Sequence, residues 1–202
     1  MLIKTPDLEI AYREQGQAEP IILLHGFGLN YHIWDPIVAA FHEKARFITP
    51  DLRGHGQSEV REGTYSMDSL AADLAAFMDA LGIERAMVGG HSLGGYVALA
   101  FAAANPGRLS GLALITTNAR ADAPDKRQGR YDTAQAVQLQ GASALAGSLG
   151  PRLSKDQALV EALQLMISQT HPQGIIGASL GMAERPDRME TLKALTCPIL
   201  VV

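Results

Sequence analysis

Short apolar runs recur along the first part of the chain and predict buried strands. Residues 8–13 alternate apolar and polar positions, as a half-buried strand does, whereas residues 21–24 are apolar throughout. Continuous apolar runs are typical of strands that are covered on both faces of a parallel sheet. Similar runs at residues 46–49, 86–89 and 112–116 therefore predict a sheet that is mostly parallel.

Helices are expected between these strands. After Ser66, apolar residues recur three and four positions apart up to Gly82, which is the spacing of one helix face. Ser66 is a suitable N-terminal cap, and Gly82 stands where a C-terminal cap is expected. Further helices are expected at residues 33–42 and 93–105. Strands that alternate with helices predict an α/β fold with helices flanking the sheet.

The pattern of apolar residues changes after Thr117. Residues 118–195 contain no strand-like run, and a strand pattern returns only in the last five residues. We therefore expect a core formed by residues 1–117 and 196–202, interrupted by a helical insertion at residues 118–195. Within the insertion, helices are predicted at residues 134–149, 155–169 and 173–182.

The composition narrows the class of protein. Of the 202 residues, 47% are hydrophobic and 19% are charged, and this balance excludes intrinsic disorder. The formal net charge is −4 without a basic block, so we expect no binding to nucleic acid or to a membrane. No apolar stretch is long enough for a signal peptide or a membrane span. We therefore expect a cytoplasmic protein.

The cysteine content limits the kinds of site that the chain can hold. The single cysteine, Cys197, cannot form an internal disulfide. One cysteine also excludes a zinc site that is built on cysteines. We expect neither a metal nor another cofactor.

Residues 90–94 carry the strongest chemical signal in the sequence. They read Gly90-His91-Ser92-Leu93-Gly94 and match the pattern G-x-S-x-G between a predicted strand and a predicted helix. The alternative is a glycine-rich turn with a surface serine, as in nucleotide-binding folds. Neither G-x-x-x-x-G-K-[ST] nor G-x-G-x-x-G is present, so this alternative is disfavoured.

A serine at the centre of this motif is suited to nucleophilic catalysis. The sharp turn from strand to helix would lift Ser92 Oγ above the sheet, and Gly90 and Gly94 leave room for that turn. The helix that follows directs N–H groups and its positive dipole end at the same place. An oxyanion beside Ser92 would be stabilised there. We therefore interpret Ser92 as the catalytic residue and Gly90 and Gly94 as the glycines of the nucleophile turn.

Three motifs together make the sequence resemble the α/β-hydrolase fold family. They are His25-Gly26-Phe27-Gly28, Asp51-Leu52-Arg53-Gly54-His55-Gly56-Gln57-Ser58 and the turn around Ser92. The sequence is most similar to the branch of small-molecule esterases, lactonases and haloperoxidases, which carry a helical cap between the sixth and seventh strands. The resemblance implies that residues 118–195 are this cap and that the backbone N–H groups of Phe27 and Leu93 form an oxyanion hole.

The type of nucleophile limits the class of reaction that is expected. Family members with aspartate at this position form alkyl-enzyme esters, whereas Ser92 implies an acyl-enzyme and hence hydrolysis of a small carboxylic ester or lactone. We interpret His25 as a residue that hydrogen-bonds its own loop rather than as a base. Trp34 faces either the substrate or a helix, and the sequence does not decide between them. Apolar residues of the insertion are candidates for the pocket lining: Leu139, Leu145, Leu163, Met166, Ile167, Ile175 and Met182.

Two members of a catalytic triad have no counterpart in this chain. In the family that the sequence resembles, the acid follows the strand that residues 199–202 are expected to form, and the histidine follows one further strand, so both lie beyond Val202. Only His171 follows the motif, and it precedes Pro172 within the insertion. We therefore expect the chain to be C-terminally incomplete, without the last strand and helix, and poorly active alone. The apolar edge strand at residues 199–202 would favour homo-oligomers.

Two other classes of function remain open beside a serine hydrolase with a small-molecule ester or lactone as substrate. One is a non-catalytic module that binds a small ligand on a hydrolase-like scaffold. The other is an assembly in which a second polypeptide supplies the acid and the histidine. Asp122 and Asp125 lie where a minority of families place the acid, but without a histidine they complete no triad. Labelling with a fluorophosphonate discriminates, because only an activated Ser92 reacts.

Overall fold

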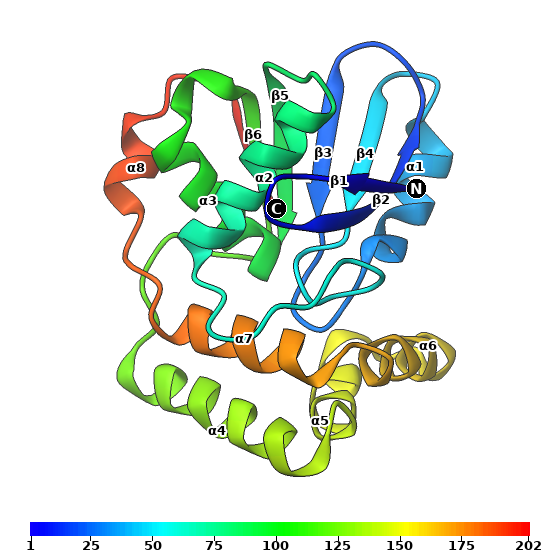
Figure 1. Cartoon of the computed structure of the whole chain (residues 1–202), viewed down its shortest axis with the longest axis vertical. Helices are drawn as coiled ribbons and strands as arrows, with labels where there is room; N and C mark the ends of the chain where they lie inside the picture. The colour runs from blue at the N-terminus through cyan, green and yellow to red at the C-terminus, as the bar shows by residue number, and fades with distance from the viewer.

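A seven-stranded sheet forms the centre of the molecule, and a layer of helices lies across one end of it (Figure 1). The computed structural model describes all 202 residues. In chain order the strands are β1 (Leu2–Lys4), β2 (Glu9–Gln15), β3 (Pro20–Leu24), β4 (Arg46–Pro50), β5 (Ala86–His91), β6 (Leu109–Ile115) and β7 (Ile199–Val201). Their order across the sheet is β1-β2-β4-β3-β5-β6-β7.

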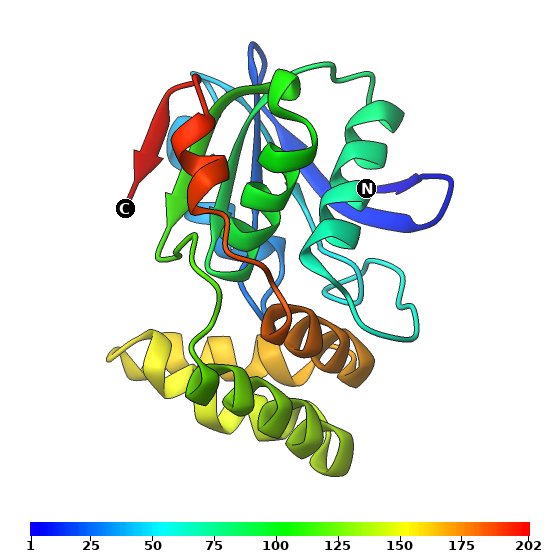
Figure 2. The same cartoon turned by 90° about the vertical axis from the view of Figure 1, so that its left-hand side faces the viewer.

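The sheet is mixed, with a parallel centre. Strands β4, β3, β5, β6 and β7 run parallel, whereas β1 and β2 form an antiparallel extension at one edge. Figure 2 shows β7 at the opposite edge of the sheet. This arrangement confirms the expected α/β fold with a mostly parallel sheet. The apolar pattern does not predict β1, because its three residues are partly exposed and are held by pairing with β2.

Helices cover both faces of the sheet. On one face α2 packs against α3, and α8 also contacts α3. On the other face, Trp34 and Val38 pack onto Leu23 and Phe47 of the sheet. No helix has both the length and the apolar content that crossing a membrane requires. The helices around the sheet are η1 (Tyr31–Trp34), α1 (Asp35–Phe41), α2 (Met67–Ala80), α3 (Leu93–Ala104), η2 (Pro106–Arg108) and α8 (Met189–Ala194).

Both predicted ends of the helix before β5 are confirmed. α2 begins after Ser66, whose Oγ accepts a hydrogen bond from Ser69 N at 3.0 Å. The chain leaves this helix through Gly82, where φ is +66°. Because a positive φ is costly for residues with a side chain, glycine sets the point at which the chain turns toward β5.

Four helices form a separate layer at the carboxyl ends of the parallel strands (Figure 1). This four-helix layer consists of α4 (Pro124–Gln140), α5 (Ser143–Leu153), α6 (Gln157–Ser168) and α7 (Pro172–Ala183). The predicted single helix at residues 134–149 is wrong, because the chain breaks at Gly141, where φ is +74°. The first turns of α4 are polar and carry no apolar periodicity, which explains why the sequence pattern misses its start at Pro124.

Helix α7 lies directly against the core through three glycines. A Cβ at Gly174 would lie 1.9 Å from Gly54 O, and a Cβ at Gly181 would lie 1.7 Å from Tyr65 O. Between them, the carbonyl of Gly177 accepts a hydrogen bond from Tyr65 N at 2.9 Å. Such close backbone contact needs residues without a side chain, so α7 is the part of the four-helix layer that is fixed to the core.

The chain enters and leaves the four-helix layer at neighbouring points. Arg188 N donates to Ala119 O at 2.7 Å and so joins the two crossing segments. Close by, Arg185 Nη1 lies 2.8 Å from Asp122 Oδ1, and both side chains are buried. The junction between core and layer is therefore held by a backbone hydrogen bond and a buried ion pair.

Candidate active site

Ser92 occupies a strained backbone position between β5 and α3. Its φ and ψ are +51° and −109°, in a region that residues other than glycine rarely adopt. Hydrogen bonds hold the main chain on both sides: Ser92 N donates to Ile115 O at 2.9 Å, and Ser92 O accepts from Thr117 Oγ1 at 2.9 Å. These bonds to β6 and the segment after it keep the serine at the sharp turn that the motif predicts.

Gly90 and Gly94 make the turn possible, because main-chain atoms fill the space where their side chains would be. A Cβ at Gly90 would lie 2.2 Å from Gly94 C, and a Cβ at Gly94 would lie 2.4 Å from Leu24 O. Alanine at either position would collide with backbone that cannot rotate away. The contact with Leu24 also brings the start of α3 against the end of β3.

The loop that follows β3 lies beside the serine turn. Leu24 pairs with Gly90 in the parallel register of β3 and β5. Two residues further on, Gly26 packs against the ring of His91, where a Cβ would lie 2.5 Å from Nδ1. The loop therefore approaches the turn so closely that a side chain at position 26 would displace the ring of His91.

Phe27 lies inside a tight turn whose form is set by glycine. Leu29 N donates to Gly26 O at 3.1 Å, and Gly28 has a φ of +72°, as the third position of a type II turn requires. Leu93, the second residue expected to donate a backbone N–H, opens α3. The side chains of both residues are buried. The two N–H groups thus belong to segments that contact each other.

His25 supports this loop and is not placed as a base. Its Nδ1 donates to Gly26 O at 2.8 Å and its Nε2 accepts from Leu52 N at 2.9 Å, which occupies both nitrogens of a neutral imidazole. Complete burial, reinforced by the neighbouring ring of His55, lowers the pKa of His25 to about 3. His25 is therefore neutral at pH 7 and ties the end of β3 to the loop after β4.

Asp51 connects the same two loops. Its Oδ1 accepts from Tyr31 N at 2.8 Å and its Oδ2 accepts from Gln57 N at 2.9 Å. Burial raises the pKa of the Asp51 carboxyl to about 6, although both hydrogen bonds oppose the increase. Nearby, Arg53 binds Asp73 through two hydrogen bonds, at 2.8 and 2.6 Å. This motif therefore braces the loops around the serine turn.

None of the remaining histidines forms a hydrogen bond with the serine. His32 lies 2.7 Å from Asp35 at the surface, and His171 caps α7 by accepting a hydrogen bond from Gln173 N. His91 is largely enclosed, and burial lowers its pKa. The hydrogen bonds of the histidines in this chain lead to backbone groups or to Asp35, and none leads to the side chain of Ser92.

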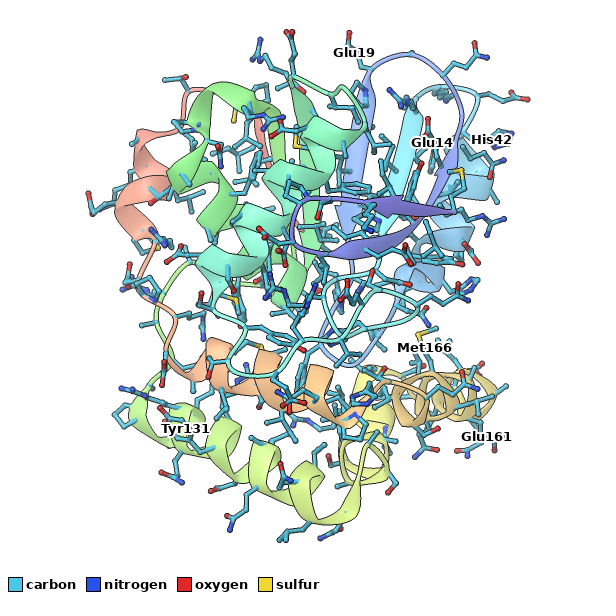
Figure 3. The ribbon with its side chains drawn as sticks, viewed as in Figure 1. Glu14, Glu19, His42, Tyr131, Glu161 and Met166 are labelled. Carbon is cyan, nitrogen blue, oxygen red and sulfur yellow. The ribbon has the colours of Figure 1, made fainter.

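An apolar cleft of about 380 Å³ opens between the core and the four-helix layer. It reaches the serine turn through His91, which precedes the serine, and Ile115, whose carbonyl accepts the serine N–H. Figure 3 shows Met166 at the boundary between α6 and the core. Nine of the eleven lining residues are hydrophobic, and neither lysine nor arginine is among them: Leu29, His32, Ile33, Trp34, His91, Ile115, Leu153, Leu159, Ala162, Leu163 and Met166.

The residues predicted to line a pocket are only partly placed there. Leu163 and Met166 line the cleft. Leu145 and Ile167 instead approach Gly28, where the four-helix layer meets the loop after β3. The other three predicted residues lie elsewhere, one of them exposed and two fully buried: Leu139, Ile175 and Met182.

Trp34 combines the two roles that the sequence left open. It lines the cleft and also packs against Leu23 and Phe47 of the sheet. The prediction missed Leu159, although the sequence holds a signal for it. Leu159, Ala162, Leu163 and Met166 recur at the spacing of one helix face, and this face of α6 is the one that the cleft exposes.

The fold and the serine turn define a class of protein, and comparison with known families agrees with it. Residues 19–180 match the model of the alpha/beta hydrolase fold family. The chain therefore belongs to that family. The matched region includes the serine turn, the loop after β3 and nearly all of the four-helix layer.

The chain is similar in sequence and structure to esterases and enol-lactonases. The chain is 30% identical to 3-oxoadipate enol-lactonase 1 of Acinetobacter baylyi, over 98% of this chain and 74% of the enol-lactonase. A thermophilic esterase from Thermogutta terrifontis superposes with a TM-score of 0.93 at 37% identity, over 100% of this chain and 78% of the esterase. The enol-lactonase from Burkholderia xenovorans gives 0.90 at 28% identity, over 100% and 80%. The chain is an alpha/beta hydrolase similar to esterases and enol-lactonases.

Proposed function

We propose that this chain carries the nucleophile of a serine hydrolase that cleaves a small carboxylic ester or lactone through an acyl-enzyme on Ser92. The observation that supports the proposal most directly is the backbone of Ser92, held at a φ of +51° by hydrogen bonds to Ile115 and Thr117. Strain of this kind persists at functional sites because the surrounding structure enforces it.

The chemistry follows from the groups around the turn. Ser92 Oγ attacks the carbonyl carbon and loses its proton, and the carbonyl oxygen becomes an oxyanion. In our proposal the N–H groups of Phe27 and Leu93 donate hydrogen bonds to that oxygen. The alcohol then leaves with a proton, and water hydrolyses the acyl-enzyme to restore the serine. Backbone donors suit this role because they do not titrate and need little reorganisation.

The cleft favours an uncharged, apolar substituent on the substrate. Its lining is mostly aliphatic and includes Trp34, with His32 and His91 as the polar members. A free carboxylate on the substrate would have no cationic partner, because the lining contains neither lysine nor arginine. We therefore propose simple esters and lactones of modest size as substrates, with the four-helix layer acting as the cap over the apolar group.

The general base and the acid that orients it are proposed to lie outside residues 1–202. Within these residues no histidine side chain hydrogen-bonds Ser92: five of them pair with backbone groups or with Asp35, and Nδ1 of His91 has no partner. A serine without a base is a weak nucleophile, so turnover by these residues alone is expected to be slow. The oxyanion donors would still give residual reactivity toward strong electrophiles.

Labelling with a fluorophosphonate tests the proposal. We expect one phosphonyl group per chain on Ser92, identified by peptide mass spectrometry, and none on Ser92→Ala. Ser110→Ala is the matched control, because Ser110 is an exposed serine on β6 and its loss should leave the labelling rate unchanged. A correctly folded chain that stays unlabelled over hours would reject the hydrolase proposal and favour a non-catalytic ligand-binding module.

A further inference from the structure

The tight turn around Phe27 is bound to the four-helix layer by one buried hydrogen bond. Thr170 Oγ1 donates to Gly28 O at 3.0 Å. The threonine is 3% exposed, and its partner lies 142 positions earlier in the chain. Leu145 Cδ2 and Ile167 Cγ2 approach the same glycine, at 2.9 and 3.4 Å from the position of a Cβ. The layer therefore contacts this turn with one polar group and two apolar ones.

The position of Thr170 is itself fixed relative to the core. It lies between α6 and α7, two residues before the first residue of α7. The same helix is held flush against the core by the contact of Gly174 with Gly54 and by the hydrogen bond from Tyr65 N to Gly177 O. A continuous path of rigid contacts thus leads from the loop after β4, through α7 and Thr170, to Gly28.

We propose that Thr170 is a positioning residue that holds the turn carrying the Phe27 N–H in the form needed to bind an oxyanion. This inference rests on the proposed function, in which that N–H is one of the two donors. Without the hydroxyl, Gly28 O is left buried with no hydrogen bond, and the turn moves to find another partner. Donors stabilise an oxyanion only when they are aimed at its position in advance, so a small movement of Phe27 slows the chemical step.

Thr170 acts on the chemical step rather than on substrate binding. It is not among the residues that line the apolar cleft. It borders a neighbouring, more polar cavity of about 190 Å³, together with Asp51 and Tyr31. Its loss should therefore lower the maximal rate of reaction at Ser92 and leave the affinity for an apolar reagent unchanged.

Three variants separate this role from a general effect on stability. Thr170→Val removes the hydroxyl at constant shape, and Thr170→Ser retains it. Thr133→Val is the matched control, because Thr133 Oγ1 makes a similar hydrogen bond to Gly129 O at an exposed site on α4. For each variant, hydrogen exchange measures the protection of the Leu29 amide, which donates within the turn, and fluorophosphonate labelling measures the maximal rate and the apparent affinity at Ser92.

We expect Thr170→Val to accelerate exchange at Leu29 and to lower the maximal labelling rate roughly two- to twelvefold, the range that one hydrogen bond supports. Apparent affinity and exchange in β5 should stay at wild-type values, and Thr170→Ser and Thr133→Val should resemble the wild type. Unchanged exchange at Leu29 in Thr170→Val overturns the inference, as does an unchanged labelling rate. If the wild type is not labelled but exchange at Leu29 rises only in Thr170→Val, the hydrolase proposal fails. The support of the turn by the Thr170 hydroxyl then still stands.

Discussion

The guanidinium of Arg185 stacks on the ring of Tyr96, with Cζ 3.9 Å from the ring centroid. Tyr96 belongs to the first turns of α3, four residues after the serine, and Arg185 follows α7 where the chain leaves the four-helix layer. The guanidinium also binds the carboxylate of Asp122 and donates to Arg120 O at 2.8 Å. One buried side chain thus connects α3 with both segments that join the layer to the core.

Replacing Arg185 should destabilise the protein strongly. Arg185→Met leaves the Asp122 carboxylate, whose side chain is 1% exposed, without its closest cation. We expect the free energy of unfolding to fall by about 3 kcal/mol, as for other broken buried pairs. Urea denaturation measures the change. In the control Arg127→Met, which loses an exposed stacking contact with Tyr131, the loss should be about 0.5 kcal/mol. Equal losses in the two variants would contradict this account.

The glycine contacts of α7 predict a large difference between two substitutions of the same kind. Gly181→Ala places a Cβ 1.7 Å from Tyr65 O, so α7 must move away from the core. We expect a loss of about 3 kcal/mol, at the upper end of overpacking costs. In Gly129→Ala the added methyl group meets nothing within 4 Å on the exposed side of α4, and helix propensity should stabilise the protein by up to about 1 kcal/mol. Thermal unfolding of both variants checks the difference in sign.

The buried histidines predict how stability depends on pH. Burial lowers the pKa of His55 to about 4, although its hydrogen bond to Arg53 O opposes the decrease. Because the pKa is lower in the folded state than the ordinary value near 6.5, the stabilisation is complete above pH 6.5 and is lost as pH falls toward 4. Between pH 7 and 4 this loss amounts to about 3 kcal/mol for His55, at 1.36 kcal/mol per unit of pKa shift.

His55→Gln removes this titration while His25 retains its own. Urea denaturation at several pH values should therefore show a decrease in stability between pH 7 and 4 that is smaller in the variant by about 3 kcal/mol. A loss of stability that is the same at every pH does not affect this comparison, because only the change in the free energy of unfolding with pH is compared. Parallel curves for wild type and variant would show that His55 does not titrate with a lowered pKa.

Exogenous imidazole should accelerate reaction at Ser92 if a histidine base is supplied from outside residues 1–202. A positioned general base contributes about 100- to 10,000-fold, so we expect imidazole to raise ester hydrolysis roughly tenfold or more above the rate of Ser92→Ala under the same conditions. The rate should follow the neutral form of imidazole as pH is varied. Equal rates for wild type and Ser92→Ala at every imidazole concentration would contradict the expectation.

The edge strand β7 predicts self-association of residues 1–202 when they are produced as a separate chain. Its residues Ile199, Leu200 and Val201 are 38%, 52% and 68% exposed, and apolar edges of this kind pair with other chains. We expect size-exclusion chromatography with light scattering to show oligomers that dissociate in Val201→Lys. Leu139→Lys is the matched control, because it removes an apolar side chain that is 75% exposed on α4, away from the edge. A monomeric wild type at high concentration would count against this prediction.

The strands and the serine turn are predictable because their signals are local. A continuous apolar run such as residues 21–24, followed by His25 and Gly26, identifies a buried strand and its end without knowledge of its neighbours. The two caps of α2, at Ser66 and Gly82, are local in the same sense. In contrast, α4 begins at Pro124 with polar turns, and helices of this kind leave no apolar period in the sequence.

The lining of the cleft and the support of the Phe27 turn are harder to predict from the sequence, because they depend on contacts between residues far apart in the chain. An exposed leucine on α6 such as Leu159 lines the cleft only because η1 and β6 lie opposite. The hydrogen bond between Thr170 and Gly28 joins residues 142 positions apart, and no motif marks the threonine. A resemblance between sequences is enough to propose Ser92 as the nucleophile, whereas the residues that support the Phe27 turn are found only in the three-dimensional arrangement.

The hydrogen bond from Arg188 N to Ala119 O has a consequence for how such proteins diversify. Because the two crossing points lie side by side, the intervening segment can be exchanged for another of different length without separating any strands of the sheet. A graft from a related hydrolase at these two positions would bring a new cleft wall to an unchanged nucleophile turn. Because Thr170 lies within this segment, such a graft would also replace the residue that supports the Phe27 turn, so substrate preference and catalytic geometry would change together.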